Sequence, residues 1–152
     1  MKTHKKILTY KTKEFLHFLD ITDDVQKVIQ ESTAMDGMVL IYSYHTTAAI
    51  RINEKEKGLV RDFKMLAKKI APKDIYYHHN DLSVRTENLV CEKGATGCLN
   101  GHSHMLHLLM GATSEMLPVV DGKLVLGTWQ RIFLVELDVS RKRNVLVKVL
   151  GE

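Results

Sequence analysis

The sequence predicts a single α+β domain in which about three helices accompany a largely antiparallel sheet. Short apolar runs of strand length occur near both ends of the chain, and the last third contains only such runs, separated by turn residues. Helical periodicity is confined to stretches between them. Strands that follow one another through tight turns pair in antiparallel fashion, and separate groups of helices and strands are typical of α+β domains.

The composition is that of one globular domain. Of the 152 residues, 45% are hydrophobic and 26% are charged, which excludes a disordered or fibrous protein. We expect one domain spanning residues 1–152. No apolar run approaches the roughly 18 residues that a membrane span needs, no signal-peptide pattern is found, and two cysteines make no disulfide framework. These features predict a cytoplasmic protein that does not bind a membrane.

The net charge of +4 is compatible with a small phosphorylated or anionic ligand. The basic residues gather near both ends of the chain, at Lys2, Lys5, Lys6, Lys11 and Lys13 and at Arg141, Lys142 and Arg143. A basic surface attracts anions, including phosphorylated metabolites. No arginine-rich run interleaved with aromatic residues is present, so nucleic-acid binding is not expected.

The first third of the chain contains four strand-length apolar runs, at residues 5–10, 14–20, 38–44 and 48–52. The first two are expected to form a hairpin. The third is continuously apolar, which is typical of a strand covered on both faces. Between them, Thr22 before Asp23-Asp24 has the pattern of a helix N-cap with an acidic first turn, and Gly37 ends the connection after that helix.

The remaining elements are marked by clearer signals. Apolar residues at helical spacing predict a helix over residues 55–70, which Pro72 ends. After a long polar stretch, typical of functional or mobile loops, a short helix over 103–110 is capped by Asn100 or Ser103 and ends at Gly111. We expect the three helices to cover one face of the sheet. Strands are predicted at residues 113–120, 123–126, 129–138 and 144–150, with a hairpin turn at Asp121-Gly122.

Histidines from three segments are the main candidates for a functional site. His45 follows a predicted strand, His78-His79 lie in the long polar stretch, and His102, His104 and His107 lie in the short helix. Neutral imidazole is the commonest metal ligand and is suited to proton transfer near pH 7. On a helix, His104 and His107 share a face while His102 and His104 do not, so a site needs groups from the other segments. The alternative is that several of these histidines are surface or structural residues.

Other motifs fit known sites less well. Six residues separate Cys91 from Cys98, whereas zinc sites usually pair cysteines two to four residues apart. Gly94, Gly97 and Gly101 do not follow a strand, as a phosphate-binding loop would require. Trp129 either packs in the core or lines a pocket for a flat ring.

Four polar motifs follow one another along nearly the whole chain. They are His45-Thr46-Thr47-Ala48-Ala49 with Ile52-Asn53-Glu54, Tyr77-His78-His79-Asn80-Asp81, Asn100-Gly101-His102-Ser103-His104, and the segment from Val120 to Gln130. In order and spacing they resemble the signatures of the YjbQ family. The resemblance implies a compact α+β subunit that assembles as a homotrimer, with a site near the subunit boundary. It also implies a weak, secondary thiamine-phosphate synthase activity.

The resemblance also implies roles for individual residues. Catalytic roles are expected for His45, His102, Glu54 and Asp81; substrate binding for Thr46, Asn53, Asn100, Trp129 and Gln130; and binding of a divalent metal ion, Mg²⁺ or Zn²⁺, for His79, His102 and His104. The implied reaction joins a hydroxymethylpyrimidine pyrophosphate to a thiazole phosphate. The alternative is a divalent-metal or anion-binding protein, either non-catalytic or hydrolytic. The segment Cys91–Leu99 departs from the shorter acidic connections typical of the family, so we expect a different ligand selectivity.

Overall fold

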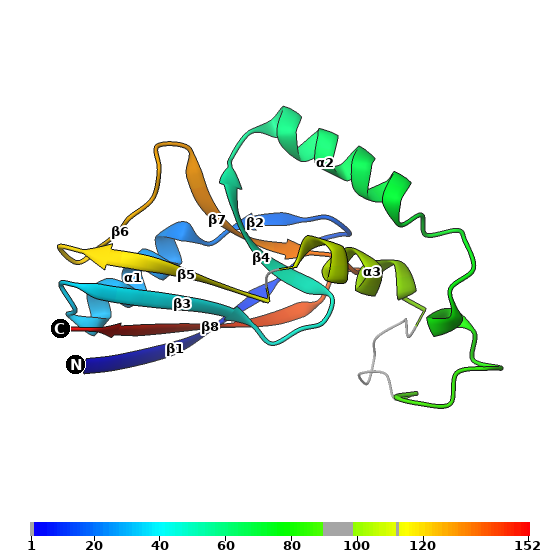
Figure 1. The fold of residues 1–152 in the computed structure, drawn as a ribbon, viewed down its shortest axis with the longest axis horizontal. Coiled ribbons are helices and arrows are strands. Elements are labelled where there is room, and N and C mark those ends of the chain that lie inside the picture. Colours follow the sequence, from blue (N-terminus) through cyan, green and yellow to red (C-terminus); the bar gives the residue numbers. More distant parts are fainter. Residues whose placement is uncertain (1, 90–98, 112) are drawn as a thin grey trace.

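Figure 1 shows the computed structural model of the chain, which describes residues 2–89, 99–111 and 113–152. Within these ranges the structure has eight strands and three α-helices, so the predicted α+β class is confirmed. The strands are β1 (Lys2–Lys11), β2 (Phe18–Asp20), β3 (Gly37–Ser43), β4 (Ala48–Glu54), β5 (Ser114–Val120), β6 (Lys123–Leu124), β7 (Gln130–Glu136) and β8 (Lys142–Gly151). The helices are α1 (Thr22–Ser32), α2 (Lys57–Ile70) and α3 (Gly101–Met110), with a short 3₁₀ helix η1 (His78–Asn80).

The strands form two antiparallel sheets. One has the order β1-β8-β3-β5-β6 and the other the order β2-β7-β4. The predicted hairpin between residues 5–10 and 14–20 is therefore wrong, because β1 pairs with β8 and β2 with β7. The reason lies at Leu16, which is fully buried with a left-handed φ of 57° and donates its N–H to the carbonyl of Glu136. The chain is thus anchored at the second sheet instead of turning back along β1.

Two cores lie on opposite faces of the three-stranded sheet. Along β7, Ile132 and Leu134 face a core shared with α1 and the five-stranded sheet, while Phe133 and Val135 face a core shared with α2 and α3. Successive side chains of a strand point to opposite faces, so this sheet is buried on both sides. The expectation that all three helices cover one face is wrong, because α1 packs in the first core and α2 and α3 in the second.

The ends of the elements differ in detail from the sequence signals. Helix α1 is capped at Ile21 and not at Thr22. The Thr22 hydroxyl instead donates to Asp20 at 2.7 Å and accepts the N–H of Ile132 at 2.8 Å. Helix α1 ends at a left-handed Thr33, and Gly37 begins β3. The turn at Asp121-Gly122, with φ of 51° and 69°, joins β5 to β6 as predicted.

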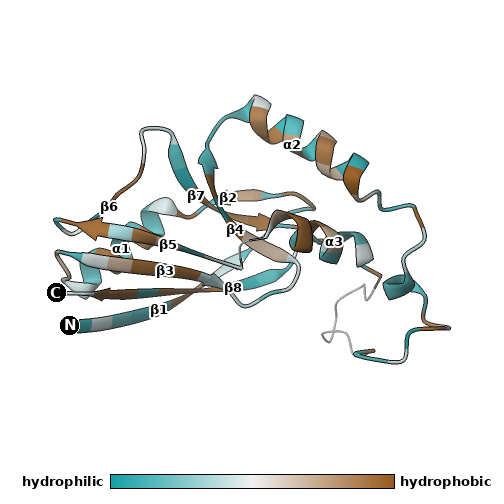
Figure 2. Ribbon diagram, viewed as in Figure 1, coloured by the Kyte–Doolittle hydropathy of each residue, from teal (hydrophilic) through white to brown (hydrophobic). Residues whose placement is uncertain are grey.

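Two surfaces remain partly uncovered in the single chain. Strand β3 buries Val39 and Ile41 completely, but Met38 on the other face is 43% exposed, so the strand is not covered on both faces within the subunit. Helix α2 is amphipathic, with an apolar side and a polar side, and lies at the periphery of the fold (Figure 2). In the part of the chain that the structure describes, no helix is long and apolar enough to cross a membrane.

Candidate functional site

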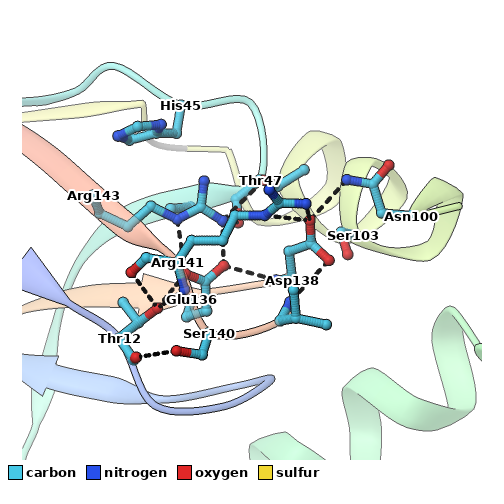
Figure 3. Close-up of polar contacts among 12 residues, drawn as sticks. Thr12, His45, Thr47, Asn100, Ser103, Glu136, Asp138, Ser140, Arg141 and Arg143 are labelled. Atoms are coloured by element: carbon cyan, nitrogen blue, oxygen red, sulfur yellow. Dashed lines mark hydrogen bonds and ion pairs between the residues drawn. The ribbon is translucent and has the colours of Figure 1, made fainter. Parts of the chain in front are cut away.

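A buried ion pair joins the ends of β7 and β8. Glu136 is fully buried, Arg143 is 3% exposed, and the two side chains are paired through Arg143 Nε at 2.7 Å and through Nη2. The Thr12 hydroxyl donates to Glu136 Oε2 at 2.7 Å, and Arg143 also donates to Thr47 Oγ1 at 3.0 Å. Figure 3 shows these groups pointing toward one another. A buried charge needs such complete pairing because its desolvation is costly.

A second carboxylate extends this network to α3. Asp138 is 4% exposed, and its Oδ2 accepts hydrogen bonds from Arg141 Nε at 3.0 Å and from Asn100 Nδ2 at 2.8 Å. Its Oδ1 accepts the N–H of Val139 at 2.8 Å. These bonds outweigh the effect of burial and lower the pKa of Asp138, although burial is the largest single influence and acts in the opposite direction. Asp138 is therefore an ionised carboxylate that holds the residue before α3 (Figure 3).

Two predicted metal ligands meet beside Asn100. His79 Nε2 lies 3.1 Å from Asn100 Oδ1, and the His79 and His104 rings lie with their centroids 4.5 Å apart. Arg85 brings a positive charge to the same place and donates to the main-chain oxygen of His79 at 3.0 Å. The helix η1 therefore delivers His79, and α3 delivers His104, to one cluster. We call these four residues, Arg85, His79, Asn100 and His104, the Asn100 cluster.

Burial keeps His104 neutral near pH 7. Its pKa is lowered first by burial and second by the nearby His79, and the neighbouring Asp138 opposes this shift only in part. A neutral imidazole has one donor and one acceptor nitrogen, so it can bind a metal ion, donate to an anion or transfer a proton.

His45 lies at another part of the network. Its Nε2 accepts the N–H of Asn144 at 2.8 Å, so a neutral His45 carries its proton on Nδ1. Thr46 is exposed, whereas its neighbour Thr47 is 5% exposed and binds Arg143. Of this motif, the structure thus places Thr47 in the buried network and His45 at its border.

His102 points away from His104 on α3. It is 4% exposed, packs edge-on against Phe15 with ring centroids 5.4 Å apart, and lies 3.3 Å from the Ser103 hydroxyl. Its Nδ1 is buried and has no hydrogen-bond partner among the residues that the structure describes. Burial is the main cause of its lowered pKa. His102 and His104 are therefore on different faces of the helix, as the sequence predicts.

The remaining predicted ligand-binding residues lie at the tip of the β4–β7 ribbon. Glu54 pairs with Gln130 across the two strands, and Asn53 pairs with Arg131. Trp129 is 71% exposed, which excludes core packing within the subunit. Asn53 and Glu54 border an apolar cavity of about 360 Å³ between β4, α2 and α3, lined inside by Phe18, Phe63, Phe133 and Leu106.

Asp81 has a local structural role. It accepts hydrogen bonds from the N–H of Ser83 at 3.0 Å and from the Tyr76 hydroxyl at 2.8 Å. Within the described residues, no three or more His, Cys, Asp and Glu side chains lie close enough together to hold a metal ion. The predicted metal ligands therefore do not all meet in one chain there, and Cys91 and Cys98 lie outside the described residues.

Sequence reasoning missed the buried charges. Glu136 and Asp138 interrupt an apolar run of the sequence, and two arginines follow within seven residues of Glu136. An acidic residue in an apolar run is seldom buried without a partner. That pattern was a usable signal that Arg141 and Arg143 are internal counter-ions and not part of a basic surface.

Comparison with known proteins identifies the family. The sequence matches the model of the family described as "UPF0047 protein YjbQ-like" over residues 6–152. The chain belongs to the YjbQ family. A UPF0047 protein of Archaeoglobus fulgidus is 38% identical over 143 residues, which cover 94% of this chain and 98% of the relative. The UPF0047 protein YugU of Bacillus subtilis is 32% identical, with 96% of this chain and 98% of YugU covered.

Solved structures of similar proteins share this fold. A crystal structure of a YbjQ-like protein of unknown function from Sulfolobus solfataricus P2 is 35% identical, with a TM-score of 0.84 and 99% of both chains covered. A hypothetical protein from Aeropyrum pernix K1 is 33% identical, with a TM-score of 0.82 and coverage of 98% of this chain and 99% of that one. The family resemblance and the α+β fold are thus confirmed, whereas the activity and the site roles stay predictions.

Proposed function

We propose that this YjbQ-family protein binds a small phosphorylated ligand at the Asn100 cluster and has a weak, secondary thiamine-phosphate synthase activity. The observation that supports this most directly is the meeting of His79, His104 and Arg85 around one amide, with ring centroids 4.5 Å apart for the two histidines. Imidazole N–H groups and a guanidinium are suitable partners for phosphate oxygens.

The chemistry of the reaction suits such a cluster. The ring nitrogen of the thiazole phosphate forms a bond to the methylene carbon of the pyrimidine substrate while the bond to pyrophosphate breaks, so negative charge grows on the leaving group. Fixed donors that face this charge lower the barrier. In the proposal, His104 donates to the leaving pyrophosphate and Arg85 supplies a positive charge beside it.

Among the residues that the structure describes, there is no ready site for the metal ion expected for this reaction. The buried carboxylate beside the cluster, Asp138, already accepts from Asn100, Arg141 and Val139, and no three candidate ligands gather in the described ranges. Mg²⁺ commonly binds through substrate phosphates with few protein ligands. The proposal therefore assigns no step to a metal ion that the protein itself holds.

The test is formation of thiamine phosphate from the two phosphorylated precursors. The unmodified protein should give slow, enzyme-dependent product formation. His104→Gln should lower the rate by about 10²–10³, the usual effect of removing one transition-state donor. Absence of product with the unmodified protein would contradict the synthase activity.

The matched control is His4→Gln. His4 lies on β1 opposite Val149 and 3.8 Å from Glu31, whereas the histidines of the Asn100 cluster lie on η1 and α3. Its variant should keep the rate within about threefold, less than 1 kcal/mol of barrier. Equal rates for the two variants, with both folded by circular dichroism, would remove His104 from the mechanism.

A second candidate function is binding of a divalent metal ion. The paired imidazoles of His79 and His104 supply two nitrogen ligands, and burial lowers the pKa of His104. Further ligands would then come from another subunit. Elemental analysis of protein that was never exposed to a metal-affinity column tests this, and less than one tenth of an equivalent of metal per chain would contradict it.

A further inference from the structure

The Asp138 carboxylate takes part in hydrogen bonds in one direction only. Arg141 and the N–H of Val139 donate to its carboxylate, and these contacts keep the side chain ionised. An ionised carboxylate can only accept hydrogen bonds. Of the two ends of the Asn100 amide, the NH₂ must therefore face Asp138, at 2.8 Å. The orientation of the Asn100 amide is thus set by the charge of Asp138.

The other end of the amide, the carbonyl oxygen, then determines which ring nitrogen of neutral His79 carries the proton. The carbonyl oxygen of Asn100 lies 3.1 Å from His79 Nε2 and can only accept a hydrogen bond. We propose that Asp138 is a positioning residue that acts through Asn100 to hold neutral His79 as the Nε2–H tautomer, leaving the lone pair on Nδ1. This resembles the way that a buried carboxylate orients a histidine in other sites.

Arg85 lies close to the same nitrogen without changing this assignment. Its Nη1 lies 3.3 Å from His79 Nε2 and would need a bare nitrogen to donate to, whereas the shorter contact of 3.1 Å to the Asn100 oxygen needs a proton on Nε2. We take the shorter contact as the one that sets the tautomer. Arg85 instead donates to main-chain oxygens of His79, Glu87 and Asn88, at 3.0, 3.0 and 2.5 Å. These bonds hold the guanidinium of Arg85 beside the imidazole of His79, and the lone pair on His79 Nδ1 takes no part in them.

The tautomer determines what His79 can recognise. A neutral His79 accepts through Nδ1, so it binds a donor group or a cation there. It can donate to a phosphate oxygen through Nδ1 only after gaining a second proton, and the bond to Asn100 is kept when it does. His79 and His104 therefore have different roles for a phosphorylated ligand, and this part of the inference rests on the proposed function.

The tautomer itself can be read without any ligand or activity. In protein labelled with ¹⁵N-histidine, long-range ¹H–¹⁵N spectra at a pH well above the ordinary imidazole pKa separate a protonated ring nitrogen from a bare one. The His79 signals are assigned by their loss in His79→Gln. We expect the proton on Nε2 in the unmodified protein, and a proton on Nδ1 would overturn the proposal.

Two variants separate positioning from general packing. Asp138→Asn no longer dictates the amide orientation, and Asn100→Ala removes the carbonyl while keeping the Asp138–Arg141 pair. Both should give His79 a mixture of tautomers. Asp20→Asn is the control, because it removes an equally Arg-paired carboxylate, 2.9 Å from Arg131. Unchanged His79 spectra in the Asn100→Ala variant would overturn the proposal that Asp138 acts through Asn100, whatever the result of the synthase assay.

Discussion

At the residue scale, the buried ion pair of Glu136 and Arg143 connects the sheet ends to the proposed site. Glu136 accepts from Arg143, from Thr12 and from the N–H of Asp138 at 2.9 Å. Asp138 in turn accepts a hydrogen bond from Asn100. The chain of contacts from Arg143 through Glu136 and Asp138 therefore positions the Asn100 cluster. Charges in such networks depend on one another, since each loses its compensation when a partner is removed.

The substitution Glu136→Gln should destabilise the fold strongly. It leaves the Arg143 guanidinium buried without a counter-ion, and breaking a buried pair in this way costs about 3–5 kcal/mol. Urea unfolding followed by circular dichroism measures the change. The exposed pair of Glu14 and Lys64 offers the control, since Glu14→Gln should leave the unfolding midpoint nearly unchanged. A small effect of Glu136→Gln would show that Arg143 finds another partner.

Stability should also fall as the pH is lowered from about 7.5 to about 5.5, across the ordinary imidazole pKa. Burial lowers the pKa of His102, His104 and His107 in the folded protein. In this window the unfolded chain therefore binds more protons than the folded one, and protons favour unfolding. The loss begins near the unfolded pKa of histidine and is complete below the folded values.

The variant His102→Gln should reduce this pH dependence, because His102 is almost fully buried and its Nδ1 has no hydrogen-bond partner in the described part of the chain. The quantity to compare is the difference in unfolding free energy between the two pH values, since the variant also changes packing against Phe15. Equal pH dependence in the variant and the unmodified protein would argue against His102 as a source of the effect.

At the element scale, strands and helices were predictable to different degrees. Local patterns such as Asp121-Gly122 and the apolar spacing in α2 indicated β5–β6 and α2 correctly. The pairing of β1 with β8 could not be predicted, because it joins residues more than 130 positions apart and depends on Leu16 being held at Glu136. The same holds for the Asn100 cluster. Its histidines could be predicted from sequence motifs, whereas the contact of Asp138 with Asn100 joins residues 38 positions apart and is seen only in the fold.

Helix α2 depends on a local cap for its first turn. The Glu56 carboxylate accepts the N–H groups of Gly58 and Leu59, each at 2.6 Å, and these bonds lower the pKa of Glu56. Glu56→Ala should therefore speed amide hydrogen exchange at Gly58 and Leu59 by several-fold, with little change beyond the second turn. Asp62→Ala, in the middle of the helix, is the control. Equal exchange in both variants would contradict a capping role.

At the scale of the whole molecule, one face of the five-stranded sheet is suited to assembly. Met116 is 57% exposed and pairs with Leu40, while Met38 is 43% exposed and pairs with Pro118 and Leu150, so apolar side chains lie together on this face. Large exposed apolar patches commonly mark protein interfaces. This observation supports the homotrimer that we propose from the family resemblance.

Light scattering should accordingly give about three times the chain mass of 17.4 kDa at micromolar concentration. Met116→Glu should shift the protein toward the monomer by placing a charge in the apolar face. Met65→Glu, at a methionine of similar exposure on α2, should leave the assembly intact. A single monomer peak for the unmodified protein would contradict the proposal.

The most direct test of ligand binding at the Asn100 cluster is an amide NMR titration with inorganic pyrophosphate. Pyrophosphate is the leaving group of the proposed reaction, so its binding should move the amide signals of His79, Asn100 and His104 in a saturable way. His104→Gln should weaken these shifts, while His4→Gln should preserve them. Saturable shifts confined to another surface, such as the lysines at the end of α2, or no shifts at all, would contradict the account.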